Sequence, residues 1–263
     1  MTKQHDVPVW PHDVTTLAID IGGSGVKASV LDAQGVLLVD RVRIDTPYPC
    51  PPERLVATIR ELIAPLPRAH RASVGFPGLV RDGRILGVPS LTRASYDGDT
   101  DPGLLAQWYG FDLGHALAHA LNIPTLIVND ADMQGCAVIE GTGMEFVITL
   151  GTGVGTAVFN EGHLLPHLEL SHVPFNADMS IDIAIGNVER KRIGNKKWIK
   201  RVRRALGYFD EAIAFDQLYV GGGNAKLLEP ADVGPKGTIV SNQAGVIGGV
   251  RLWDITAASI HHG

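Results

Sequence analysis

Residues 16–31 read TLAIDIGGSGVKASVL, and this stretch decides the fold class that we expect. Two apolar runs, Thr16 to Ile21 and Val26 to Leu31, are separated by GGSG, which is typical of two strands joined by a glycine turn. Glycines after a strand let backbone N–H groups approach an anion closely, because no Cβ intervenes. Taken alone, an ordinary glycine-rich hairpin is the simpler explanation of this turn.

The same pattern returns in the second half of the chain. Strands are predicted over 145–150 and 156–159, and the turn between them reads Gly151-Thr-Gly-Val-Gly155. A third glycine turn, Gly221-Gly-Gly-Asn224, follows a strand predicted over 217–220. The remaining predicted elements are strands over 36–44, 72–76 and 124–128, and helices over 51–64, 113–121, 196–206 and 244–253.

This repetition predicts an α/β fold of two domains with a cleft between them. We place the first domain at 1–127, with 244–263 packing back on it, and the second at 128–243. A length of 263 residues, 45% hydrophobic and 19% charged, is ordinary for a globular chain with a large core.

Composition also excludes several classes of protein. The chain has no run of 18 consecutive apolar residues, so we expect no membrane-spanning helix. The first sixteen residues have no apolar run that could be a signal peptide. Cys50 and Cys136 are the only cysteines and lack the spacing of zinc ligands, so we expect a reduced, cytoplasmic protein without zinc.

Two groups of polar residues are candidates for chemistry. The sequence Asn129-Asp-Ala-Asp132 follows the apolar strand PTLIV, where an acid is either a helix cap or a general base. Glu169 and His172 lie three residues apart, so on a helical turn both would face one way and could bind vicinal hydroxyls of a sugar. Two polar side chains that simply face water are the simpler explanation of this second pair.

A basic run stands out against a formal net charge of −5, because nine of the fifteen residues from Arg190 to Arg204 are Lys or Arg. A solvated helix face explains it most simply. Nucleic acid or an anionic membrane is a second explanation, which the net negative charge and the lack of a long apolar face disfavour. The third is a linear polyanion bound by Lys196, Lys197, Lys200, Arg201 and Arg204.

The order of the motifs then adds what no single motif provides. DIGGSGVK from Asp20, FPG at 76–78, NDAD at 129–132, LGTGVG at 150–155, ELSH at 169–172 and GGGN at 221–224 together resemble the ROK family of sugar kinases. The resemblance covers about Leu17 to Trp253 and implies the actin-like (ribonuclease H-like) two-domain fold. The basic run with its Lys197–Trp198 pair, and the lack of a zinc-binding cysteine cluster, resemble the branch that uses polyphosphate on glucose.

The resemblance implies phosphoryl transfer from inorganic polyphosphate to the 6-hydroxyl of glucose in a homodimeric enzyme. ATP is the alternative or additional donor, and Asp130 would be the general base. The implied sugar contacts are Asn129, Glu169, His172, Asp182 and Gly78. The implied donor contacts are Asp20, which would also hold Mg²⁺ through water, and Gly22, Gly23, Ser24, Lys27, Gly151, Thr152, Gly153, Gly155, Gly222 and Gly223.

Departures from the family pattern bear on the sugar. Ser171 stands where the family has glycine, Ser90 where a sugar-binding Asn is usual, and residues 91–107 resemble an insertion. Asp182 stands for a Glu and is one methylene shorter, so we expect a pocket that admits glucose and mannose alike. ROK repressors are not expected, because too few residues precede Thr16 for a helix-turn-helix, and Asp130 with three glycine turns disfavours a non-catalytic sugar sensor.

Overall fold

The computed structural model describes residues 10–241 and 244–260. Residues 1–9, which belong to the N-terminal segment where we expect no signal peptide, lie outside the described residues. The chain divides into an N-terminal unit, residues 1–137 with 245–263, and a C-terminal unit, residues 138–244. Helix α4 (Asp130–Cys136) belongs to the N-terminal unit, because it packs on strands β4 (Arg71–Phe76) and β7 (Thr125–Asn129) of that unit. No helix of the described residues is long and apolar enough to cross a bilayer.

A five-stranded sheet forms the centre of the N-terminal unit, in the order β3-β2-β1-β4-β7. The hairpin is antiparallel, whereas β4 runs parallel to β1 and β7 parallel to β4. The carboxyl ends of β1, β4 and β7 therefore meet at one edge of the sheet. Its strands are β1 (Thr16–Ile21), β2 (Val26–Leu31), β3 (Val42–Ile44), β4 (Arg71–Phe76) and β7 (Thr125–Asn129).

The long strand predicted over 36–44 is wrong in its first half, since only Val42–Ile44 forms a strand. Val36 and Leu38 are 59% and 50% exposed, so their apolar side chains do not lie in a sheet face. Three short elements of this unit had no prediction: β5 (Leu79–Arg81), β6 (Arg84–Gly87) and α2 (Pro102–Trp108).

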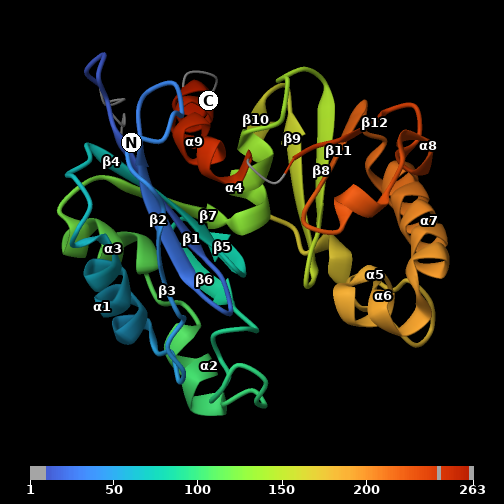
Figure 1. The fold of residues 1–263 in the computed structure, drawn as a ribbon, viewed down its shortest axis with the longest axis horizontal. Coiled ribbons are helices and arrows are strands. Elements are labelled where there is room, and N and C mark those ends of the chain that lie inside the picture. The colour runs from blue at the N-terminus through green and yellow to red at the C-terminus, as the bar shows by residue number, and fades with distance from the viewer. Residues whose placement is uncertain (1–9, 242–243, 261–263) are drawn as a thin grey trace, which may run out of the picture. The chain divides into compact units, whose positions relative to one another are not determined.

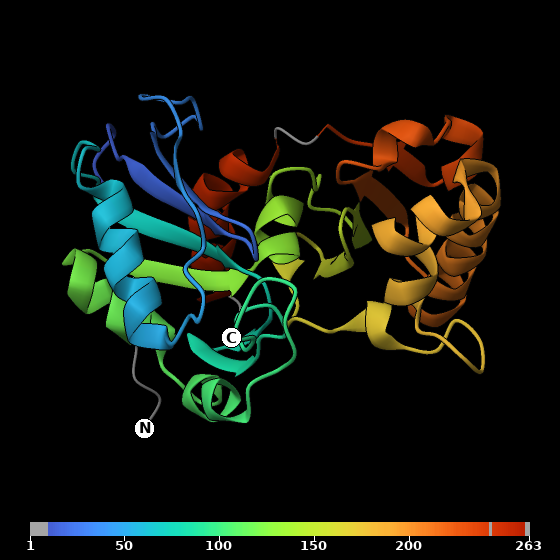
Figure 2. The ribbon, with the colours of Figure 1, turned by 60° about the horizontal axis from the view of Figure 1, so that its bottom comes forward.

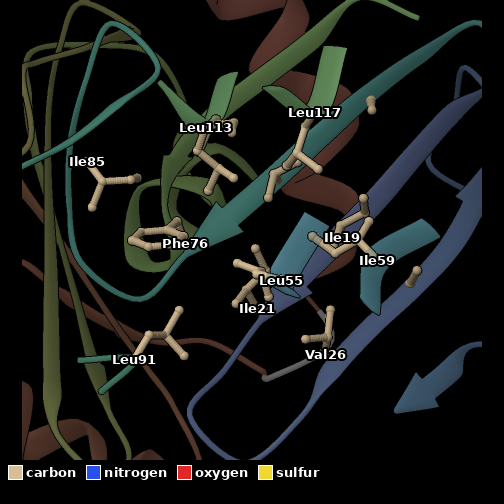
Figure 3. Close-up of a cluster of buried hydrophobic side chains, with 14 of the residues drawn as sticks. Ile19, Ile21, Val26, Leu55, Ile59, Phe76, Ile85, Leu91, Leu113 and Leu117 are labelled. Atoms are coloured by element: carbon tan, nitrogen blue, oxygen red, sulfur yellow. The ribbon is translucent and has the colours of Figure 1, made fainter. Parts of the chain in front are cut away.

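Helices cover both faces of this sheet. Helices α1 (Pro52–Ile63) and α3 (Leu113–Leu121) lie on one face, and α9 (Ala244–Ile260) lies on the other (Figures 1 and 2). Figure 3 shows Ile19 and Ile21 of β1 meeting Leu55 and Ile59 of α1 in the core beneath the hairpin. The apolar runs that predicted the hairpin therefore also bury its strands.

Helix α9 approaches the sheet and α4 unusually closely at two glycines. Ser73 on β4 donates its hydroxyl to the carbonyl of Gly249 and accepts from the indole of Trp253 at 2.9 Å. A Cβ on Gly248 would overlap the carbonyl of Met133 on α4. Glycine at 248 is thus what lets the two backbones touch.

We expect Gly248→Ala to lower the free energy of unfolding by about 1–3 kcal/mol, as overpacking of a closed contact does. Urea denaturation of the purified chain measures this. Gly207→Ala is the matched control, because Gly207 lies in a helix of the C-terminal unit with no atom within 4 Å of a Cβ. An equal loss of stability in the two variants would contradict the close contact at Gly248.

The C-terminal unit repeats this plan, as the sequence predicts. Its sheet has the order β10-β9-β8-β11-β12, in which β8 and β9 form an antiparallel hairpin and β11 runs parallel to β8. The strands are β8 (Met144–Leu150), β9 (Val154–Asn160), β10 (His163–Leu164), β11 (Gln217–Gly221) and β12 (Gly237–Ile239).

Helix α7 (Asn195–Ile213) is the longest helix described and contains the helix predicted over 196–206. Its buried stripe includes Val202 and Leu206, which belong to the same hydrophobic core as Phe146 and Ile148 of β8. Trp198 is fully buried and donates its indole N–H to Ile185 at 2.7 Å. The shorter elements around it are η1 (Leu170–His172), α5 (Ile181–Ile185), α6 (Asn187–Ile193), η2 (Ala225–Leu227) and α8 (Pro230–Val233).

Candidate functional site

One edge of the N-terminal sheet collects three of the sequence motifs. The glycine turn 22–25 follows β1, Gly78 follows β4, and Asp130 follows β7. The register pairs Asp20 with Gly75 and Phe76 with Asn129, so these strands end side by side. The carboxyl edge of parallel strands is where open α/β sheets bind their ligands.

Asp130 is the first residue of α4, and Asn129 holds it there. The side-chain oxygen of Asn129 accepts from the amide of Ala131 at 2.8 Å, and its nitrogen donates to Gly78 at 3.0 Å. A Cβ on Gly78 would overlap the carbonyl of Gly87. The buried Asn129 therefore caps the helix and ties it to the turn after β4, whereas the half-buried Asp130 stays at the surface of that edge.

Asp20 offers a hard oxygen ligand beside the glycine turn. Its carboxylate lies 3.5 Å from the ammonium of Lys27, and the side chains are 43% and 49% exposed. Both line an open pocket together with Arg41 and Met133. Mg²⁺ in phosphoryl-transfer sites is held by one or two carboxylates and by substrate phosphates, so a single exposed Asp fits it. No group of three or more His, Cys, Asp or Glu within the described ranges could hold a metal ion by itself.

The other two glycine turns meet in the C-terminal unit. Asn224 donates its amide to Leu150 at 2.9 Å and its side chain to Gly151 at 3.0 Å, which joins the turn after β11 to the turn after β8. Gly222 has φ +87°, and a Cβ there would overlap Leu150, so the residue must be glycine. This contact brings Gly151–Gly155 and Gly221–Asn224 together.

Asp182 also supports the first of these turns. Its carboxylate accepts from the amide of Val154 at 2.7 Å. This carboxylate therefore holds the glycine turn after β8, and the contact of Asp182 with the sugar stays a prediction.

Glu169 lies between two imidazoles. His172 lies 3.8 Å from one carboxylate oxygen, as the spacing of three residues on a turn suggests, and buried His167 lies 3.7 Å from the other. The interaction with His167 is the largest cause that lowers the pKa of Glu169 below its ordinary value, and the charge of His172 acts in the same direction. His167 is a partner of Glu169 that the sequence analysis did not single out.

The basic run separates into two chemically different sets. All five arginines are engaged within the unit: Arg192 and Arg201 bind the buried Glu189 at 2.6 and 2.7 Å, and Arg203 binds Asp232. These contacts lower the pKa of Glu189 to about 2. Arg190 bonds Asn187 and Asn195, and Arg204 bonds Tyr208 and covers Phe175.

The four lysines of the run differ from the arginines. Lys191, Lys196, Lys197 and Lys200 are exposed, and the described part of the chain offers them no hydrogen bond or ion pair. The predicted row of Lys196, Lys197, Lys200, Arg201 and Arg204 thus holds three exposed lysines, whereas Arg201 and Arg204 are occupied by partners in the same unit.

Comparison with known proteins identifies the family of this chain. The family model described as the ROK family matches residues 16–167. The chain is 31% identical to a polyphosphate glucokinase of Mycobacterium leprae over 216 residues, 78% of this chain and 62% of that protein, so it spans less than two thirds of that relative's length. It is 30% identical to a polyphosphate glucokinase of Mycobacterium tuberculosis over 214 residues, 78% of this chain and 76% of that protein.

A solved structure shares the fold over nearly the whole chain. The inorganic polyphosphate/ATP-glucomannokinase of Arthrobacter sp. strain KM superposes with a TM-score of 0.76 at 26% identity, covering 93% of this chain and 100% of that one. The fold is thus that of the actin-like sugar kinases, and this chain belongs to the ROK family.

Proposed function

We propose that this protein transfers the terminal phosphoryl group of inorganic polyphosphate to the 6-hydroxyl of glucose. The observation that carries the proposal is the edge of the N-terminal sheet, where a glycine turn follows β1 and a carboxylate on a helix N-terminus follows β7, with β4 between the two strands. A base for a hydroxyl and amides for a phosphate are what this reaction needs. Polyphosphate use by relatives at about 30% identity supports the choice of donor.

In the proposed reaction, Asp130 accepts the proton of the sugar hydroxyl as its oxygen attacks the terminal phosphorus. A new phosphorus–oxygen bond forms to the sugar, the bond to the next phosphate breaks, and the polymer leaves one unit shorter. Amides of the turn 22–25 face the charge that develops on the transferring group. The general base contributes about 10²–10⁴-fold of the rate.

Mg²⁺ is the cofactor that the fold family implies. When bound, it would neutralise charge on the donor phosphates. Asp20 would hold it through water, because its carboxylate is exposed at the end of β1 beside the glycine turn. Lys27, across the hairpin from Asp20, would add a positive charge next to the same phosphates.

The C-terminal unit would recognise the two substrates. Glu169 and His172 would bind sugar hydroxyls, since their side chains lie together and partly exposed. The exposed lysines of α6 and α7 would bind the phosphates of a long donor, because each lacks an internal partner among the described residues. The homodimer stays a prediction from family likeness.

An ATP-dependent hexose kinase is the second candidate. The observation that favours it is the engagement of all five arginines of the basic run, which leaves four free cations instead of nine. ATP needs only one or two cations, whereas a long polyanion gains from every additional one.

One assay distinguishes these candidates. The purified chain is incubated with glucose, Mg²⁺ and either polyphosphate or ATP, and glucose 6-phosphate is measured. We expect turnover with polyphosphate at a lower KM, counted per molecule, than with ATP. Turnover with ATP alone would favour the second candidate, and turnover with neither would refute both.

We expect Glu169→Gln to raise the Kd of glucose about 10–100-fold, because a charged hydrogen-bond acceptor is lost. The lowered pKa of Glu169 keeps its carboxylate ionised at neutral pH. Its contribution to stability and to sugar binding is therefore present above the ordinary pKa of a glutamate and is lost as pH falls through the lowered value. Isothermal titration calorimetry measures the affinity, and an unchanged Kd would remove Glu169 from the sugar site.

A further inference from the structure

Side chains from one segment bind three successive carbonyls of the glycine turn after β1. Thr46 donates its hydroxyl to Gly22 at 2.6 Å, and Tyr48 donates to Gly23 at 2.7 Å. Arg43, at the middle of β3, donates to Ser24 at 3.0 Å. Residues 43–48 thus hold the turn from one side.

These contacts determine where the amides of the turn point. A peptide unit is planar and trans, so its N–H is directed opposite to its C=O. When the carbonyls of residues 22, 23 and 24 point toward segment 43–48, the N–H groups of Gly23, Ser24 and Gly25 point away from it. Within the described residues, these three amides donate no hydrogen bond, whereas the amide of Gly22 closes the turn onto Gly25 at 3.0 Å. Successive N–H groups aimed one way bind an anion such as phosphate.

We propose that Thr46 and Tyr48, helped by Arg43, are positioning residues that aim the glycine-turn amides at the terminal phosphoryl group of the donor. The proposal rests on the proposed function and adds to it residues that lie outside the turn and outside every motif of the sequence analysis.

Burial and chemistry support these roles. Thr46 is 7% exposed, so its hydroxyl has little access to water as an alternative acceptor. Desolvation raises the pKa of Tyr48, which keeps its hydroxyl protonated and able to donate. That hydroxyl has one proton, and Gly23 at 2.7 Å is a closer acceptor than Ser90 at 3.2 Å.

Glycine at position 25 belongs to the same arrangement. A Cβ on Gly25 would lie 2.7 Å from the guanidinium of Arg43. The guanidinium therefore packs on the bare backbone of the turn, where it also reaches the carbonyl of Ser24.

The test compares Tyr48→Phe and Thr46→Val, which remove one hydroxyl each. We expect kcat/KM for the donor to fall about tenfold in each and further in the double variant, since misaimed donors stabilise the transferring group less. The Kd of glucose without donor should stay within about twofold, because the sugar contacts are untouched. Thr46→Ser retains the hydroxyl and should restore donor kinetics to within about threefold of wild type.

Matched controls make the same chemical changes elsewhere. Tyr109→Phe alters a tyrosine that is 69% exposed, and Thr58→Val alters a threonine whose hydroxyl bonds Arg54 within α1. Both should leave donor kinetics unchanged. Thermal unfolding followed by circular dichroism reports whether each variant is folded, and Tyr48→Phe decides the test should Thr46→Val fail to fold.

A second readout separates this inference from the proposed function. Calorimetric titration with tripolyphosphate should give a Kd about tenfold weaker in Tyr48→Phe than in wild type. Unchanged donor kinetics in a wild type that does phosphorylate glucose would overturn the inference alone, and so would an equal loss of glucose affinity. A wild type without activity would refute the proposed function. In that case the titration still tests the inference, which equal affinities of wild type and Tyr48→Phe for tripolyphosphate would overturn.

Discussion

Replacing Asp130 with Asn is expected to lower kcat for glucose phosphorylation at least about 100-fold, with the Kd of glucose within about twofold of wild type. Asparagine has the same shape but cannot take the proton of the attacking hydroxyl. Its side-chain oxygen can still accept from the amide of Ala131, which Asp130 does at 2.9 Å. The variant therefore changes the chemistry with little effect on the start of α4.

Asp82→Asn is the matched control for this experiment. Asp82 is exposed, belongs to the same unit and has φ +49°, a conformation that asparagine also tolerates. It should leave kcat and stability near wild type. Turnover by Asp130→Asn close to that of Asp82→Asn would remove Asp130 as the base and leave the reaction without one.

The parts of the fold that were predictable are those with a strong local signal. The hairpin 16–31 was predicted to the residue, because two apolar strands are separated by a glycine-rich turn. The first half of the strand over 36–44 was wrong, because apolar Val36 and Leu38 are exposed and nothing in their own sequence reveals this. Helices such as α5 and α8 have five and four residues, which is too short for their sequences to show the hydrophobic periodicity of a helix.

The candidate site also has features that were predictable from the sequence and features that were not. Parallel strands bring their carboxyl ends to one edge, so the positions of the glycine turn and Asp130 follow from predictable topology. Pairings between residues far apart in the sequence do not follow from that topology. Asp182 binds an amide 28 residues away, and Arg203 binds an aspartate 29 residues away. Sequence reveals the charge of each residue but not its partner, which is why arginines and lysines of the basic run looked equivalent.

Neutralising lysines of α7 is expected to separate the two donors. In Lys196→Gln/Lys200→Gln, two exposed cations one helical turn apart are removed, and we expect the KM for long-chain polyphosphate to rise about tenfold or more. The KM for ATP should change less than about twofold, since ATP brings only a handful of charges. The dependence of polyphosphate KM on salt should also become shallower, because fewer counterions are exchanged on binding.

Arg60→Gln/Arg68→Gln is the control for net charge, because it removes two exposed cations from the N-terminal unit. It should leave both KM values unchanged.

Arg201→Gln tests the distinction between arginine and lysine, since this arginine is bound to Glu189 and its loss leaves a buried carboxylate with one partner fewer. That variant should lose stability more than polyphosphate affinity. Equal changes for polyphosphate and ATP in the lysine variant would mean that the basic run is a solvated helix face, and the protein would then be better described as an ATP-dependent kinase.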